Sequence, residues 1–404
     1  MFRLFNTLNK KIEPFDSRAR ALAIFTCGPS VYQRSHIGNF RTFLFEDILV
    51  RYLEYLGYSV TRGMALTDVE DKAIQEAKAR KMSLRQLTDE NIQKFIQEMG
   101  LLRIKAPAIL SRASDAIEEI VTIIERLIDR KIAYRHNGNI YFDPLKYPYF
   151  GEIYGLDMKR WPKKKQRFHK DTYPGMRWNL GDFILWHGED KTGEVQWETR
   201  IGKGRPSWNV QDAGLVSKYF DKTLSFYCGG IDNLIRHHDY SRAILESVRP
   251  YPMARFWLHG EHLIVEGQKM SKSKGNTFYT DDVLNQGYSS QELRFFLIYC
   301  HYRNKLNYSG RAMGTAVGEL RTLKKTIEEV GRKVRGEEEV DQTAAKQMKR
   351  VFSEKMDDDL GVKDAFKAIS ALLSEAHSKE LKPAAARGYI EALREIDNVL
   401  QVIF

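Results

Sequence analysis

Apolar residues recur at helical spacing after a short strand-like run near the start of the chain. The run Leu22–Phe25 is followed by the turn-forming pair Gly28-Pro29, and apolar residues then recur every three or four positions from Asn39 to Tyr58. The stretch Tyr58–Arg62 alternates as a strand does. A strand, a turn, a helix and a strand in this order predict the start of a parallel α/β sheet, in which ligands bind where the strands end.

The middle of the chain changes pattern twice. Residues 74–133 are predicted to be mostly helical, with the strongest amphipathic spacing from Ala116 to Ile132. Asn137-Gly138-Asn139 predicts a hairpin turn before the strand Ile140–Phe142. The chain is then rich in Pro, Gly, Lys and aromatic residues to about Gly202, with one more strand at Phe183–Trp186. This pattern predicts an insertion between two halves of the main sheet.

The second half of the sheet is expected at Leu224–Tyr227, which leads into Cys228-Gly229-Gly230. After Asn276 the spacing predicts helices over Ser290–Cys300 and Met313–Val334, a charged break at Gly336–Glu339, and two or three further helices from Thr343. The predicted parts are a first catalytic half (1–133), an insertion (134–202), a second catalytic half (203–260), a loop and stem-contact region (261–312) and a helical bundle (313–404).

Composition narrows the class of protein. A chain of 404 residues with 43% hydrophobic residues predicts two to four folded domains, and no apolar run is long enough to span a membrane. Its start lacks the pattern of a signal peptide, and only three cysteines occur, so we expect a cytoplasmic protein without a disulfide framework and with no membrane partner. The net charge of +11 favours polyanionic partners such as RNA or nucleotides. The basic run Lys159–Arg167 is either a phosphate contact or a solvated loop.

Two short motifs carry the chemistry. Lys269-Met270-Ser271-Lys272-Ser273, followed by Gly275, places two flexible ammonium groups on a loop, which suits a triphosphate. Ser35-His36-Ile37-Gly38-Asn39 stands where the first predicted helix begins, so its backbone amides can face a phosphate.

In this order the two motifs resemble the ATP-binding signatures of class I aminoacyl-tRNA synthetases, and the rest of the chain resembles the cysteinyl-tRNA synthetases. The further segments that carry this resemblance are Thr26–Tyr32, Leu66–Lys72, Gly204–Trp208, Gly229–Asp232, His237-His238, Trp257–Gly260, His301–Arg303 and Met356–Asp359. The resemblance implies a Rossmann-like α/β catalytic domain with a parallel sheet, a connective insertion and a C-terminal helical bundle. It also implies an enzyme that uses ATP with Mg²⁺ to form an aminoacyl-adenylate.

The resemblance assigns roles residue by residue. His36, Asn39, Lys269 and Lys272 take the catalytic positions, with Asn39 where the family has a second histidine. Asn still donates a hydrogen bond but carries no charge, so we expect altered rather than abolished activation. The nucleotide-binding positions are Gly38, Gly229, Gly230, Asp232, His259 and Met270.

The amino-acid pocket departs from the family. Its expected residues are Cys27, Gly28, Thr67, Trp208, Asp212 and His237, although Trp208 fits a core position equally well. The resemblance implies a zinc ion held by two cysteines, a histidine and a glutamate, and these fall on Cys27, Asp212, His237 and Ser241. Cys27, Asp212 and His237 could form a three-ligand zinc site, with Cys228 as a conceivable substitute. Ligand count nevertheless argues against tight zinc, and without zinc Asp212 would face an amine-bearing or hydroxyl-bearing amino acid.

The acceptor of the acyl group stays open between a tRNA 3′ end and a small amine. The chain stops at Phe404, where the resemblance implies that the helical bundle finishes and an anticodon-reading domain would begin, so we expect that domain to be absent. This architecture resembles the cysteine ligase of mycothiol synthesis, which acylates a small amine. The alternative function is a non-catalytic synthetase paralogue that binds tRNA or an adenylate as a regulatory module. Retention of His36 and the Lys269 loop favours the enzyme.

Overall fold

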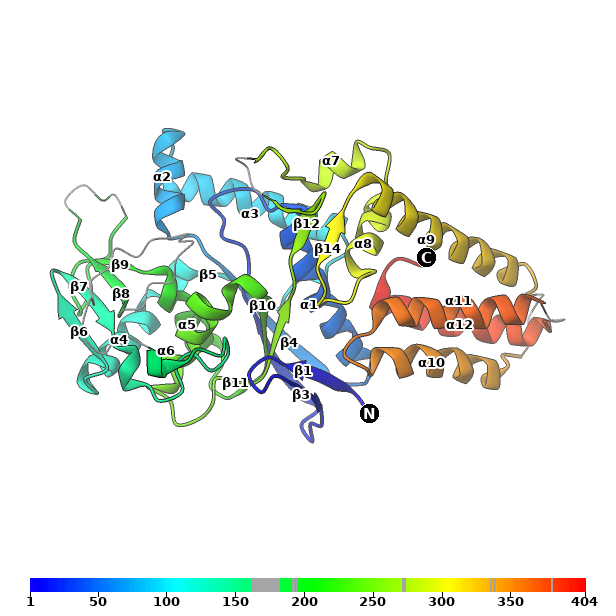
Figure 1. Ribbon diagram of the computed structural model, residues 1–404, viewed down its shortest axis with the longest axis horizontal. Coiled ribbons are helices and arrows are strands. Elements are labelled where there is room, and N and C mark those ends of the chain that lie inside the picture. Colours follow the sequence, from blue (N-terminus) through cyan, green and yellow to red (C-terminus); the bar gives the residue numbers. More distant parts are fainter. Residues whose placement is uncertain are drawn as a thin grey trace.

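A parallel sheet of five strands forms the centre of the computed structural model, with the strand order β11-β10-β3-β4-β5. The structure describes residues 1–160, 182–190, 193, 195–270, 274–334, 336, 339–378 and 381–404. The strands are β3 (Ala21–Thr26), β4 (Ser59–Leu66), β5 (Ile109–Arg112), β10 (Leu224–Gly230) and β11 (Ala254–Gly260). Their parallel pairing and the helices around them confirm the predicted α/β class (Figure 1).

Helices cover both faces of this sheet because its strands carry apolar side chains on both sides. On one face, Phe226 and Cys228 of β10 pack in a core with α1 (Ile37–Tyr55) and the C-terminal helices. On the other face, Tyr227 joins a second core with three helices. These are α4 (Ile117–Asp129), α5 (Trp208–Tyr219) and α6 (Asp239–Glu246). The side-chain alternation of one strand therefore separates Tyr227 from Cys228.

A small antiparallel sheet with the order β6-β7-β8-β9 lies at one end of the molecule (Figure 1). Its strands are β6 (Ala133–His136), β7 (Asn139–Phe142), β8 (Phe183–Gly188) and β9 (Gly204–Pro206). Asn137 and Gly138 have positive φ angles of 47° and 81° in the turn between β6 and β7, as the predicted hairpin requires. A second hairpin joins β1 (Arg3–Asn6) to β2 (Lys11–Pro14) near the N-terminus.

Most of the C-terminal helices lie at the opposite end of the molecule in Figure 1. They are α8 (Ser290–Ile298), α9 (Gly310–Gly331), α10 (Gln342–Met356), α11 (Val362–Ser378) and α12 (Pro383–Leu400), which confirms the helices expected there. Along the chain, β12 (Leu263–Val265), β13 (Gln268–Lys269) and α7 (Thr280–Leu284) come between β11 and α8, and β14 (Leu306–Tyr308) comes between α8 and α9. None of the described helices has both the length and the apolar character needed to cross a membrane.

One unpredicted strand lies in a segment that the apolar spacing predicted as mostly helical, and another lies between two predicted helices. The stretch 74–133 contains α2 (Asp71–Ala79) in part, α3 (Leu84–Leu101) and α4, but it also supplies the edge strand β5. The segment after Asn276 contains β14, which pairs in parallel with β12. Most of the basic run Lys159–Arg167, and Glu337 and Glu338 of the charged break, lie outside the described residues.

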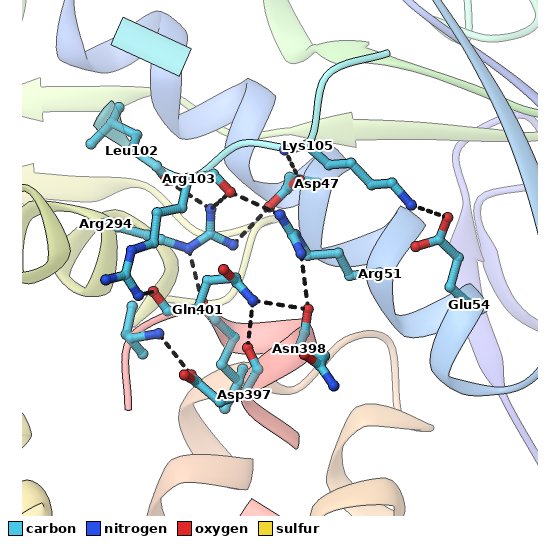
Figure 2. Close-up of polar contacts among 12 residues, drawn as sticks. Asp47, Arg51, Glu54, Leu102, Arg103, Lys105, Arg294, Asp397, Asn398 and Gln401 are labelled. Carbon is cyan, nitrogen blue, oxygen red and sulfur yellow. Dashed lines mark hydrogen bonds and ion pairs between the residues drawn. The ribbon is translucent and has the colours of Figure 1, made fainter. Parts of the chain in front are cut away.

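A buried arginine joins helix α1 to the C-terminal tail (Figure 2). Arg294 of α8 is fully buried and donates hydrogen bonds to the carboxylate of Asp47 on α1 at 2.7 Å, to Leu400 O at 2.8 Å and to Leu102 O at 2.8 Å. Asp47 also accepts hydrogen bonds from Arg51 at 2.9 Å and from the backbone N–H of Lys105 at 2.7 Å. Because four chain segments meet at this ion pair, it fixes α1 against the helical bundle.

Candidate active site

The first site residues follow the carboxyl ends of two neighbouring strands. Cys27 follows β3 and Thr67 follows β4, and the backbone groups of Thr67 bond Pro29 at 3.1 Å and Val31 at 3.0 Å. Gly28 lies against β4 so closely that a Cβ atom there would meet the carbonyl oxygen of Ala65 at 1.8 Å. Only glycine fits at this position. Cys27 and Thr67 therefore lie at the same edge of the sheet.

His36 begins helix α1 as its N-cap residue. Its Nδ1 accepts the backbone N–H of Asn39 at 3.3 Å, while the Asn39 side-chain oxygen accepts the backbone N–H of His36 at 3.0 Å. This reciprocal pair satisfies two of the amide groups that a helix start leaves without partners. Asn39 therefore helps to cap α1, and this role requires no charged side chain.

The structure brings the two sequence motifs into contact although they are some 230 residues apart in the sequence. A Cβ atom at Gly38 would meet the terminal methyl group of Met270 at 2.6 Å, and the backbone N–H of Ile37 bonds Phe278 O at 3.0 Å. Lys269 is exposed at the end of β13. Lys272 lies outside the described residues.

The end of β10 supplies the third element of the site. Gly229 and Gly230 pair in register with His259 and Gly260 of β11, and Asp232 follows with an exposed side chain. His259 is buried, and both of its ring nitrogens have partners: Nδ1 lies 2.9 Å from Thr7 Oγ1 and Nε2 lies 2.7 Å from His238 Nδ1. Burial lowers the pKa of His259 to about 3, so the ring is neutral.

A buried polar cluster lies on the α5 face of the sheet. One oxygen of Asp212, Oδ2, accepts hydrogen bonds from the hydroxyl of Tyr227 and, at 2.9 Å, from Nε2 of His237. The His237 ring stacks on Trp208, with ring centroids 4.3 Å apart and planes 11° apart. Trp208, Asp212 and His237 therefore lie together as the sequence predicted, and they line the same side of the site as Cys27.

Cys27, His237 and His238 form a compact group in the described part of the chain. The Cys27 sulfur and one ring nitrogen of each histidine lie within 4.8 Å of one another, and all three side chains are buried. Burial, with the carboxylate of Asp212 nearby, raises the pKa of the Cys27 thiol well above its ordinary value. Burial and the neighbouring rings of His259 and His237 lower the pKa of His238. Without a bound cation, the thiol is therefore protonated and the His238 ring is neutral.

The roles of Tyr227 beside Asp212 and of His238 beside Cys27 were not predicted, and one candidate residue, Cys228, lies elsewhere. Tyr227 was read only as part of a strand, and His238 only as part of a motif, because neither residue carries a local signal for its tertiary partner. Cys228, considered as a substitute ligand for Asp212, points into the core with α1 on the opposite face of the sheet. It is not a member of the described cluster.

Comparisons with known proteins identify the family. The model of the tRNA synthetases class I (C) catalytic domain matches residues 14–318. The chain is also 33% identical over 412 residues to the cysteine–tRNA ligase of Chlamydia pneumoniae, across 99% of this chain and 86% of that protein. The chain belongs to the cysteinyl-tRNA synthetase family. The cysteine–tRNA ligase of Protochlamydia amoebophila (strain UWE25) is 31% identical over 412 residues, with the same two coverages.

Solved structures confirm the class I synthetase fold. Methionyl-tRNA synthetase from Mycobacterium tuberculosis, in complex with methionyl-adenylate, aligns with a TM-score of 0.68 and 16% identity over 94% of this chain and 92% of that one. A leucyl-tRNA synthetase from Agrobacterium radiobacter K84, in a ternary complex with tRNA and LeuAMS, aligns with a TM-score of 0.67 and 12% identity over 96% of this chain and 84% of that one. At these identities the likeness concerns the fold alone.

The zinc ligands that the cysteinyl-tRNA synthetase family implies do not fit this chain as a set of four. Asp212 stands where the resemblance implies a cysteine, and Oδ2 of its carboxylate is already shared by Tyr227 and His237. Ser241, at the glutamate position, is fully buried and offers only a neutral hydroxyl. Cys27 and His237 keep the family's residue types, and His238 lies beside them. A metal ion at this place would therefore need a different ligand set.

Proposed function

We propose that this chain activates an amino acid with ATP and Mg²⁺ to an aminoacyl-adenylate and transfers the acyl group to an acceptor, either a tRNA 3′ end or a small amine. The observation that carries the proposal is the contact of Gly38 with Met270, since it places the start of α1 beside the Lys269 loop. Family membership supports an ATP-dependent ligase.

The roles of the residues follow from the chemistry of adenylate formation, in which a carboxylate attacks the α-phosphate of ATP. Such a step needs positioning and cationic stabilisation of the leaving pyrophosphate. The start of α1 with His36 orients phosphate, and the exposed Lys269, together with Lys272 of the same motif, neutralises it. Gly229 and Gly230 let the nucleoside approach the backbone. Asp232 binds the ribose hydroxyls, since its carboxylate is exposed beside Gly230.

The amino acid is the part of the reaction in which this chain departs from the family. Asp212 and Ser241 replace a thiolate and a carboxylate ligand, and Asp212 is engaged with Tyr227 and His237. We therefore propose a specificity that differs from that of the cysteine–tRNA ligases. The five predicted parts of the chain belong to the same proposal.

The test is amino-acid-dependent ATP–pyrophosphate exchange across a panel of amino acids, with and without added zinc and tRNA. His36→Asn keeps an N-cap side chain while it removes the imidazole, so we expect a native melting temperature and a loss of exchange on the order of a hundredfold. Lys269→Ala should lose as much exchange activity as His36→Asn. Lys274→Ala is the matched control, because its exposed amine bonds Gln268 at 3.2 Å on the same loop.

Exchange with no amino acid would refute the enzyme and favour a non-catalytic module that binds tRNA or an adenylate. Exchange that depends on zinc and occurs with cysteine alone would refute the altered specificity. Unchanged exchange in His36→Asn would remove that residue from the phosphate site.

A further inference from the structure

A histidine on the loop after β11 keeps one ring nitrogen without a hydrogen bond. His262 Nδ1 lies 2.9 Å from Oε1 of Glu261, and this oxygen also accepts the backbone N–H of His262 at 3.0 Å. Within the described residues, the other ring nitrogen, Nε2, has no hydrogen-bond partner and is out of contact with solvent. A buried polar atom of this kind lowers stability unless a ligand or water bonds it. His262 therefore has an unused hydrogen-bonding group.

Glu261 decides which nitrogen of His262 carries the proton. Burial raises the pKa of Glu261, but the hydrogen bonds from His262 outweigh burial and hold the pKa below its ordinary value, so this group is a carboxylate at neutral pH. A carboxylate can only accept hydrogen bonds. The proton of the neutral ring is therefore on Nδ1, and the lone pair on Nε2 is an acceptor with a fixed orientation.

Asp232 faces the same nitrogen from the neighbouring strand. Gly230 of β10 pairs in register with Gly260 of β11, and Asp232 and His262 each lie two residues beyond this pair. Oδ2 of Asp232 lies 3.9 Å from His262 Nε2, which is too far for a direct hydrogen bond. Both atoms accept hydrogen bonds when the ring is neutral. A ligand with two neighbouring donors therefore matches this acceptor pair, Asp232 Oδ2 and His262 Nε2.

Helix α1 fixes the loop relative to the start of the same helix. Arg41 of α1 is buried and donates hydrogen bonds to Glu261 O at 3.3 Å and to Leu297 O at 3.0 Å. The backbone N–H of Glu261 bonds Tyr302 O at 2.7 Å. His36, to which the proposed function assigns the phosphate, is the N-cap residue of α1. The acceptor pair and the proposed phosphate site are therefore attached to one rigid element.

The acceptor pair is accessible to a soluble ligand. The side chains of His262 and Asp232 are 27% and 59% exposed. Exposed side chains change rotamer within nanoseconds, so the Asp232 carboxylate can turn to admit a hydroxyl group beside Nε2. A metal ion fits less well, because the group of three possible metal ligands within 4.8 Å of one another in the described part of the chain includes neither residue.

We propose that His262, oriented by Glu261, forms the ribose site together with Asp232, so that the two vicinal hydroxyl groups of a ribonucleotide each donate to one member of the acceptor pair. The inference rests on the proposed function, which places ATP at this site. Asp232 was expected from the sequence to bind the nucleotide, whereas Glu261 and His262 had no predicted role. A deoxynucleotide leaves one acceptor without its donor, so the site selects ribonucleotides.

The experiment compares the binding of ATP, 2′-deoxyATP and 3′-deoxyATP to the full chain in the presence of Mg²⁺, measured by isothermal titration calorimetry. Each deoxynucleotide should bind the wild type on the order of tenfold more weakly than ATP. His262→Phe keeps an aromatic ring without the acceptor, so discrimination should be lost against one deoxynucleotide and kept against the other. His136→Phe, which removes a histidine of the small antiparallel sheet, is the matched control and should bind all three nucleotides as the wild type does.

Glu261 is a positioning residue, and its test has a separate readout. Long-range ¹H–¹⁵N spectra of the wild type should show the neutral His262 ring with its proton on Nδ1. In Glu261→Gln the amide can donate as well as accept, so both tautomers of His262 should appear. Discrimination against the deoxynucleotide that His262 recognises should fall in the same variant.

Equal affinities of the wild type for the three nucleotides would overturn the inference, and this comparison needs no variant to fold. A folded His262→Phe protein that keeps the affinities and the discrimination of the wild type would also overturn it. Discrimination that depends on His262, without pyrophosphate exchange for any amino acid, would refute the proposed function and leave the ribose site standing. Absence of ATP binding would refute both.

Discussion

Substitution of Arg294 by Met should release the C-terminal tail from the catalytic domain. The guanidinium donates hydrogen bonds to the carbonyl oxygens of Leu400 and Leu102, at 2.8 Å each, and to Asp47 at 2.7 Å. Removal of one partner of a buried ion pair costs about 3–5 kcal/mol. In the variant, Asp47 still accepts a hydrogen bond from Arg51 at 2.9 Å. We therefore expect the loss of unfolding free energy to be at the lower end of that range.

The control is Arg321→Met, because Arg321 pairs with Glu292 at 2.7 Å on the surface, where its side chain is 66% exposed. A pair of this kind contributes at most about 1 kcal/mol. Arg294→Lys keeps the charge but loses the planar guanidinium group. Its loss of unfolding free energy should therefore lie between the losses of the two Met variants.

Hydrogen exchange and thermal melting together measure the effect. In Arg294→Met we expect faster exchange of the Lys105 amide, which bonds Asp47 at 2.7 Å, and of the tail amides of Val402 and Ile403, which bond Asp397 at 2.8 Å each. The Arg321→Met protein should exchange as the wild type does. Equal protection and equal melting temperatures in Arg294→Met and Arg321→Met would refute the idea that Arg294 anchors the tail.

The ion pair of Asp47 and Arg294 also determines how the stability of the protein changes as the pH falls. Burial raises the pKa of Asp47, but the charges of Arg294 and Arg51 outweigh burial and hold the pKa below its ordinary value. The carboxylate therefore stabilises the fold above the unfolded-state pKa of about 3.9, and this contribution is lost as the pH falls through the lower folded-state value. Tail amides should stay protected down to about pH 4.

Two further predictions concern the rim of the site. Gly28→Ala should destabilise the protein severely, because its Cβ would lie 1.8 Å from Ala65 O. The control is Gly100→Ala in helix α3, where the new Cβ meets nothing within 4 Å and should stabilise the protein by about 0.5–1 kcal/mol. The melting temperatures of the two variants test this contrast. Burial raises the pKa of Glu70 to about 7, so its contribution to stability is complete below about pH 4.3 and is lost as the pH rises through 7. Glu70→Gln should remove this decline, and parallel melting curves of the two proteins from pH 4 to 8 would contradict it.

The sequence predicted the main elements where apolar spacing extends over many residues. Helix α1 begins within two residues of its predicted start, at Ile37 instead of Asn39. Strand β5 was missed because Ile109–Arg112 has only two apolar residues and forms the edge of the sheet, and β14 was missed because it has three residues. Short edge strands are defined by their neighbours, which a local pattern does not show.

The candidate site, too, was predicted only in part from the sequence. Both ATP-binding motifs were named from the sequence by resemblance, and the structure shows that Gly38 and Met270 of these motifs are in contact. The hydrogen bond of the Tyr227 hydroxyl to Asp212 was not expected, because the local pattern of a strand does not show which residue its side chain reaches. His238 could not be assigned from its place beside His237, since adjacent residues of a regular helix point in directions about 100° apart.

The backbone at these two histidines has a consequence for insertions and deletions. Leu234–His238 forms a π-helix that continues directly into α6, which is equivalent to one residue inserted into an α-helix. Loss of a single residue from this segment would restore the α-helical repeat and turn the preceding side chains by about 100° relative to α6. A one-residue gap in an alignment at this segment would therefore mark a relative in which the residues before the gap are turned relative to α6, even where both histidines remain.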